Sequence, residues 1–138
     1  MSISRFFGQG LPMKPIRNGF ALAALAAGQP ALAAPGDMSV ATYLVRAEAL
    51  QAKGMTAMFS SEIGVLRDEV TASGAAFRAR IAGEKAAGKA LSACPPQKMG
   101  MNSNILLAHL RTYPLAARAR VSMKMALADW IVKNHPCR

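Results

Sequence analysis

Two cysteines, Cys94 and Cys137, constrain the fold of this chain more than any other feature of its sequence. They are the only cysteines among its 138 residues, and both lie in the C-terminal third. An even number of cysteines in an exported chain favours a disulfide, because the compartments outside the inner membrane are oxidising. The bond would close a ring of about 44 residues, and constraining the unfolded chain in this way is worth about 4 kcal/mol.

The start of the chain has the features of an export signal. A short apolar run covers residues 20–27, and Ala31-Leu32-Ala33 supplies a small-x-small cleavage pattern. The cations that precede the run are Arg5, Lys14 and Arg17. The run is too short to span a bilayer, which needs about 20 residues. We therefore expect residues 1–33 to be a secretory signal peptide, with Met13 as an alternative start, and the protein to be periplasmic or secreted.

The rest of the chain, residues 34–138, is expected to form a single helical domain. The spacing of its apolar residues predicts an all-α fold, a small array of about four helices. These helices are expected over residues 39–53, 60–88, 103–112 and 114–134. Ser39 is a good N-cap and Gly54 can end the first helix. Residues 89–101 form a loop, and the last two helices form a C-terminal hairpin that the disulfide closes.

The core of such a domain is expected to be thin. Hydrophobic residues make up 52% of the chain, but many of them are alanines, which contribute much less burial than leucine or phenylalanine. A small domain with a thin core gains stability from a covalent staple or from the apolar surface of a partner. A homodimer is one such arrangement, and it stays open because no residue pattern requires it.

No residue pattern points to an enzyme. The alternative to a disulfide is a thiol nucleophile at Cys94 or Cys137 with His109 or His135 as its base, but no oxyanion-hole or glycine-elbow motif accompanies them. The cysteines and histidines also lack the spacing of a zinc site, and the sequence has no phosphate-binding loop. We therefore expect no catalytic residue, no metal site and no cofactor.

Three polar residues in the helices are expected to have no part in catalysis. His109 falls in an apolar stretch, where a partly buried and hydrogen-bonded histidine is the usual outcome. Asp68 and Glu69 lie next to each other in the second helix and show no pairing typical of acid–base catalysis. Both carboxylates are expected to be solvated.

The chain is strongly basic, with 17 Lys+Arg against 7 Asp+Glu and a net charge of +10. Only three of the cations lie in the leader, so the mature part stays basic. Its cations are spread out and are not interleaved with aromatic residues, which disfavours nucleic acid as a partner. An exported basic protein is more suited to contact anionic envelope polymers or acidic proteins.

A group of basic residues surrounds the turn between the third and fourth helices. The candidate partner-binding residues there are Arg111, Tyr113, Arg118, Arg120 and Lys124. One interpretation is a solvated helix face. The other is a contact surface for an acidic protein, since arginine pairs with carboxylates in bidentate geometry.

The C-terminal third contains five motifs, Cys94-Pro95-Pro96, Ser103-Asn104-Ile105-Leu106, His109-Leu110-Arg111-Thr112-Tyr113-Pro114, Ala126-Leu127 and His135-Pro136-Cys137. Through these motifs it resembles the Rap/Tai family of type VI secretion amidase immunity proteins. Proteins of that family are small, secreted, helical and disulfide-bonded. They bind and block peptidoglycan amidases, often as dimers, so the resemblance implies an amidase effector as partner.

Two functions therefore remain open. The first is an exported binding protein that inhibits a peptidoglycan amidase effector by occlusion. The second is a structural or stress-related cell-envelope protein that makes loose electrostatic contacts with anionic envelope material. Such contacts weaken as salt is added, because exposed charges are screened over about 10 Å at 0.1 M salt.

Overall fold

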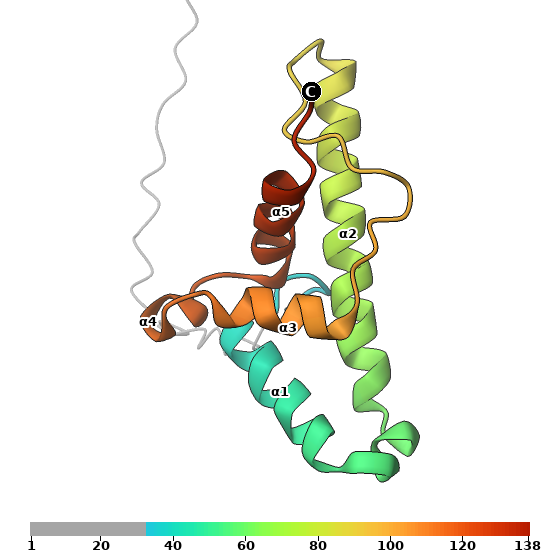
Figure 1. Cartoon of the computed structure of the whole chain (residues 1–138), viewed down its shortest axis with the longest axis vertical. Coiled ribbons are helices and arrows are strands. Elements are labelled where there is room, and N and C mark those ends of the chain that lie inside the picture. Colours follow the sequence, from blue (N-terminus) through green and yellow to red (C-terminus); the bar gives the residue numbers. More distant parts are fainter. Residues whose placement is uncertain (1–32) are drawn as a thin grey trace, which may run out of the picture. The chain divides into compact units, whose positions relative to one another are not determined.

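The computed structural model describes residues 33–138, which form helices and no strand (Figure 1). The helices are α1 (Val40–Ala52), the 3-10 helix η1 (Gly54–Phe59), α2 (Glu62–Ala86), α3 (Ser103–Arg111), α4 (Leu115–Arg118) and α5 (Met123–Asn134). The predicted all-α class is confirmed, with four longer helices and the short η1 and α4. The predicted signal peptide lies outside the described residues except for Ala33, and so does the alternative start at Met13.

Three helices begin at side chains that accept a hydrogen bond from the first turn. Ser39 Oγ accepts from the Thr42 N–H at 3.1 Å, as the sequence predicts for α1. Asn102 Oδ1 accepts from Ile105 at the start of α3, at 3.0 Å. Ser122 caps α5 in the same way. These caps satisfy backbone N–H groups that have no partner within the helix.

The prediction of one continuous helix over residues 114–134 is wrong. The chain leaves the helical conformation after α4 and becomes extended at Ser122, where φ is −81° and ψ is 159°. The cause is a contact with a distant segment. The Val40 N–H donates to the Val121 carbonyl at 2.8 Å, and Ser39 and Ser122 form an isolated antiparallel bridge. A continuous helix would use the Val121 carbonyl internally and lose this contact.

Residues 36–40, which we call the strap, run antiparallel to residues 121–124. Besides the bond at Val40, the Met123 N–H donates to the Met38 carbonyl at 2.8 Å and the Lys124 N–H donates to the Gly36 carbonyl at 3.0 Å. Gly36 has a φ of 97°, which an L side chain rarely adopts, and its Cα faces the backbone of α2. The strap therefore fastens the start of α1 to the start of α5.

Glu69 on α2 holds the strap from the other side, and the prediction that this carboxylate is solvated is wrong. Its side chain is only 4% exposed, and Oε1 accepts from the Met38 N–H at 2.7 Å. The Met38 N–H lies beyond the N-terminus of α1, so it has no partner within a helix, and burying it unpaired would cost about 1–3 kcal/mol. The neighbouring Asp68 is exposed, as expected.

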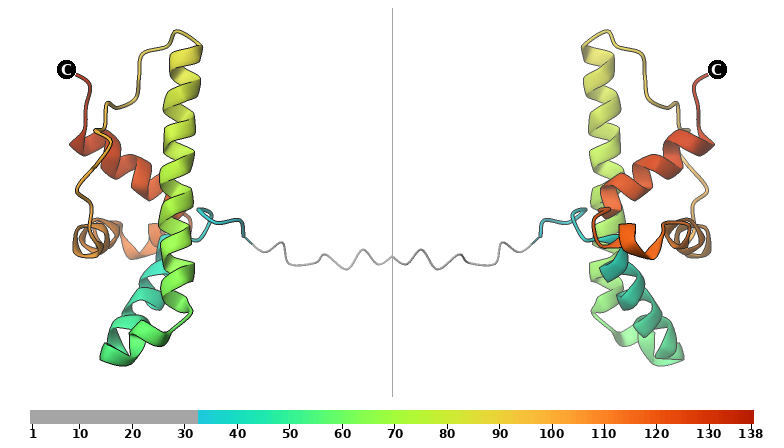
Figure 2. Two further views of the ribbon diagram at one scale, coloured as in Figure 1. Left: turned by 90° about the vertical axis from the view of Figure 1, so that its right-hand side faces the viewer. Right: turned by 90° about the vertical axis from the view of Figure 1, so that its left-hand side faces the viewer.

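The long helix α2 is the element along which the others are arranged (Figures 1 and 2). α5 packs along the half that leads to the loop before α3, and α1 lies beside the other half, to which η1 connects it. One group of buried residues joins α1, α2, α3 and the start of α5, namely Val40, Tyr43, Leu44, Ala47, Leu66, Leu106, Leu107, Leu110, Met123 and Ala126. A second group lies between α2, α5 and the loop, namely Phe77, Ala93, Leu127 and Ile131.

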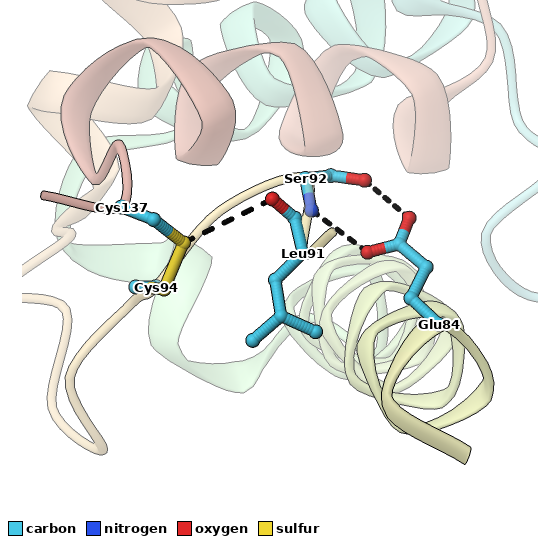
Figure 3. The surroundings of a disulfide bond; sticks show 5 residues. All are labelled: Glu84, Leu91, Ser92, Cys94 and Cys137. Carbon is cyan, nitrogen blue, oxygen red and sulfur yellow. Dashed lines mark hydrogen bonds between the residues drawn. A yellow bond between two sulfur atoms is a disulfide. The ribbon is translucent and has the colours of Figure 1, made fainter. Parts of the chain in front are cut away.

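The predicted disulfide between Cys94 and Cys137 is confirmed (Figure 3). It joins the loop after α2 to the segment that follows α5, next to a hydrogen bond of 2.9 Å from the Cys94 N–H to the His135 carbonyl. Both cysteines are exposed, whereas Ala93 beside them is buried against the second core group. Because α5 packs mainly along α2, the bond fastens the end of α5 to the segment that leaves α2.

Glu84 anchors the same loop to the end of α2. Its carboxylate accepts hydrogen bonds from the side chain and the backbone N–H of Ser92, the latter at 2.8 Å (Figure 3). It also accepts from Arg80 Nε at 3.0 Å. The bonds from Ser92, followed by the effect of Arg80, lower the pKa of Glu84 below its ordinary value. These bonds add to the disulfide in holding the loop that carries Cys94.

Replacing both Cys94 and Cys137 by serine is expected to lower the free energy of unfolding by about 2–4 kcal/mol. Both cysteines are exposed, so the loss comes mainly from freeing the unfolded chain. Urea denaturation of the oxidised protein and the variant measures this difference. Reduced wild-type protein should match the double variant, and Gln97→Ser, an exposed change in the same loop, should leave stability unchanged. A loss below about 1 kcal/mol would contradict a stabilising role of the disulfide.

Candidate functional site

The five candidate partner-binding residues do not form one continuous cluster. Arg111, Tyr113 and Arg118 meet where α3 ends and α4 begins. Arg120 is exposed in the segment between α4 and α5, and Lys124 lies in the first turn of α5. Lys124 forms an ion pair with Asp37 of the strap. Its charge is therefore partly neutralised.

Arg118 is a structural residue. Its Nε donates to the Tyr113 carbonyl and its Nη2 donates to the Arg111 carbonyl, both at 2.8 Å. The last carbonyls of a helix have no partner within it and carry the negative end of the helix dipole, so a guanidinium placed there is stabilising. Arg118 thereby folds α4 back against the end of α3, and its guanidinium is committed to the fold.

Tyr113 links the end of α3 to α5. Its hydroxyl donates to the Asp129 carboxylate, and its ring lies edge-on to His109 with 5.5 Å between the ring centroids. His109 Nε2 lies 2.8 Å from the Ala126 carbonyl, so this histidine is hydrogen-bonded and half-buried, as the sequence predicts. Burial raises the pKa of Tyr113, and the hydrogen bond to Asp129 and its charge raise this pKa further.

Arg111 is the last residue of α3 and makes a long contact with α1. Its Nη2 lies 3.5 Å from Glu48 Oε1, and both side chains are about half exposed. Exposed pairs of this kind contribute about 0–1 kcal/mol. The guanidinium of Arg111 can therefore be drawn away to another carboxylate at little cost.

Leu115, the first residue of α4, is the feature of this turn that the sequence did not predict. It is 80% exposed, although leucine in a long amphipathic helix would be expected to face the core. α4 has only four residues and none of them is buried. The one sequence signal for this exposure is Pro114, which precedes a short segment rich in alanine. It indicates an exposed Leu115 only if the helix ends soon afterwards, and that break depends on the contact with the strap.

The segment from 111 to 120, which we call the α4 turn, therefore presents one apolar side chain among cations. Leu115 is exposed, Arg120 makes none of the ion pairs in the described part of the chain, and Arg111 is only weakly paired. Arg118 and Tyr113 hold the backbone beneath them. This arrangement is a fixed, basic protrusion with an apolar centre, which suits an acidic protein surface.

A groove of about 480 Å³ lies between α1, α2 and α3. Its lining is mostly apolar, with Leu50, Ile63 and Val70 among the residues, and Arg67 is its one cationic side chain. No paired carboxylates and no nucleophile with a base line it. Within residues 33–138, no group of three or more His, Cys, Asp or Glu side chains converges in a way that could hold a metal ion.

Searches for similar proteins give no match to this chain among protein-family models, curated proteins or solved structures. In the part of the chain that the structure describes, no helix has the length and apolar character needed to cross a membrane. Any inference about function therefore rests on the geometry of the chain and on the sequence motifs of its C-terminal third.

The structure separates the roles of Arg118 and Arg120. Arg118→Ala is expected to lower the free energy of unfolding by about 1–2 kcal/mol, because it removes two hydrogen bonds from the carbonyls at the end of α3. Arg120→Ala, a matched loss of one exposed arginine, should change it by less than about 0.5 kcal/mol. Thermal and urea denaturation of both variants measures the difference. Equal effects would contradict the structural role of Arg118.

Both tyrosines of the chain are expected to resist ionisation. The pKa of Tyr43 is raised by burial and then by the charge of Glu69, and that of Tyr113 is also raised. Since the unfolded chain loses tyrosine protons near pH 10, the free energy of unfolding should fall as the pH rises above that value. Absorbance at about 295 nm follows tyrosinate formation. Tyr113→Phe should remove part of the fall, and ionisation of both native tyrosines near pH 10 would refute the prediction.

Proposed function

We propose that this chain is an exported binding protein that inhibits a peptidoglycan amidase effector by occlusion, as the immunity proteins it resembles do. The observation that carries the proposal is the α4 turn, where Leu115 is held exposed among cations on a hydrogen-bonded frame. A backbone that is held in place before binding loses little conformational entropy when the surface is covered. The α4 turn is therefore built like the centre of a protein interface.

The chemistry of the turn suggests how it would bind. Leu115 would enter an apolar depression in the partner, while Arg120 and Arg111 would pair with carboxylates around it. Arginine is enriched among the few residues that carry most of the binding energy at protein interfaces, and a leucine contributes there through the apolar area it buries. Inhibition would follow from covering the substrate path of the amidase, and it requires no catalytic residue on this chain.

The disulfide fits an exported location. Structural disulfides persist in the periplasm and outside the cell, where thiols are oxidised, and are rare in the cytosol. An amidase that acts on peptidoglycan works in the same compartment. The predicted leader and the disulfide thus support the same part of the proposal.

A cell-envelope protein with loose electrostatic contacts is the second candidate. It is favoured by five exposed lysines that make none of the ion pairs within residues 33–138, namely Lys53, Lys85, Lys89, Lys98 and Lys133. They are scattered over α1, α2, the loop and α5. This distribution suits weak attraction to anionic polymers better than a single specific contact.

The first experiment is to purify the oxidised protein after export of the full chain and to use it as bait for proteins of the source bacterium and its neighbours. Bound material is washed with 0.5 M salt and identified by mass spectrometry. One amidase retained in stoichiometric amount, whose hydrolysis of peptidoglycan stops when the complex forms, supports the immunity function. A mixture that the salt removes favours the envelope function.

With the partner in hand, Leu115→Asp and Arg120→Glu are each expected to weaken the complex at least about tenfold, because each places an acidic side chain in the contact. Titration calorimetry measures the affinity. Phe59→Ser, which removes an equally exposed apolar side chain elsewhere, is the matched control and should leave it unchanged. Unaltered affinity in both α4 variants would remove the α4 turn from the interface.

A further inference from the structure

The 3-10 helix η1 carries a second exposed apolar group, far along the chain from the α4 turn. Met55, Met58 and Phe59, which we call the apolar tip, are 82%, 72% and 93% exposed. No residue of η1 is buried. Figures 1 and 2 show η1 where the chain turns from α1 into α2, at one end of the described helices. Three large apolar side chains gathered without cover on six residues call for an explanation.

The backbone of the tip is held by local hydrogen bonds. Thr56 donates to the Lys53 carbonyl through its hydroxyl at 2.8 Å and through its N–H at 3.3 Å, and the Ser60 N–H donates to Ala57 at 2.9 Å. Gly54 allows the turn through its positive φ of 56°. The tip is thus a defined protrusion. Backbone groups that are already paired also lower the cost of contact with an apolar medium.

The charge around the tip is positive. Lys53 is the only charged residue between positions 49 and 61, and it is exposed. The next carboxylate, Glu62, lies 3.9 Å from Arg46 and is offset by it. Further along α2, exposed Arg67 is followed directly by exposed Asp68, so this stretch adds no net charge. An apolar group whose nearest charge along the chain is an exposed lysine is complementary to an anionic surface.

We propose that the apolar tip inserts into the interface of an anionic lipid bilayer. Met55, Met58 and Phe59 enter the boundary between headgroups and acyl chains, and Lys53 contacts lipid phosphates. This gives the two signals, buried apolar area and basic charge, that reversible attachment to a membrane surface requires. The proposal concerns attachment to one surface of the bilayer and involves no helix that crosses it.

The shape and chemistry of the tip favour lipid over a pocket in a protein. A protein pocket is selective because polar groups fix the orientation of what enters it. The three side chains of the tip carry no such group. The one hydroxyl of η1, on Thr56, already donates to the Lys53 carbonyl. A bilayer interface needs no matching shape, and flexible methionine side chains adapt to it. The α4 turn differs, because there a single leucine lies among arginines.

Vesicle binding of the oxidised protein tests the proposal. Vesicles of equal parts phosphatidylglycerol and phosphatidylcholine should sediment the protein, and vesicles of phosphatidylcholine alone should bind it more weakly. Phe59→Ser should lower the partition constant for the anionic vesicles about tenfold, and Lys53→Gln about fivefold. Because these side chains lie outside the core, the variants should keep the circular dichroism and melting temperature of the wild type.

Leu115→Ser and Lys98→Gln are the matched controls, since they remove an exposed leucine and an exposed lysine away from the tip. Both should retain nearly wild-type binding to the anionic vesicles. Binding that falls as much in Leu115→Ser as in Phe59→Ser would overturn the proposal. So would tip variants that keep full vesicle binding but lose a protein partner, because the tip would then be a protein-binding element.

Insertion is measured directly with Phe59→Trp. On addition of the anionic vesicles, its emission should shift to shorter wavelength, and lipids brominated in the acyl chains should quench it. Wild-type protein, whose single tryptophan is Trp130 on α5, gives the background and should change little. Emission that stays the same while the protein is bound would show surface adsorption without insertion, and it would overturn the proposal.

Discussion

The antiparallel contact between the strap, residues 36–40, and residues 121–124 is the interaction on which the rest of the structure depends. It joins two segments about 80 residues apart and is fixed on its other side by the buried carboxylate of Glu69. The start of α1, the middle of α2 and the start of α5 are thereby held at one place. In a small domain with few large core residues, these directional bonds define positions that side-chain packing alone would define poorly.

The α4 turn follows from this contact. Because the Val121 carbonyl receives the Val40 N–H, the chain cannot continue as one helix through Val121 and is extended at Ser122, and α4 has only four residues. A helix so short cannot bury a face, so Leu115 stays in solvent. Arg118 then turns back to the end of α3, which leaves Arg120 at the surface. The proposed binding site is thus a consequence of how α1 enters the fold.

Local signals in the sequence predicted the parts of the fold that depend on neighbours along the chain. Ser39 and Gly54 delimit α1, and two cysteines in a chain with a predicted export leader predict their own pairing. The helix break at Val121 and the burial of Glu69 depend on a partner some 30 to 80 residues away. Nothing in their own neighbourhoods marks them, except Ser122, whose capping role can be recognised once the break is known. The exposure of Leu115 could not be predicted for the same reason.

Within the described residues, the two short helices carry the most exposed of the large apolar side chains, and the four long helices build the frame. A small domain with few large apolar residues loses burial whenever one of them stays in solvent. Yet Phe59, Met55 and Leu115 are all outside, in η1 and α4, while the longer helices bury leucines. The chemistry around these groups differs, with a single lysine beside the tip and several arginines around Leu115. A protein attached to lipid through η1 would still present α4, which Figure 1 places on another part of the described helices, to a soluble partner.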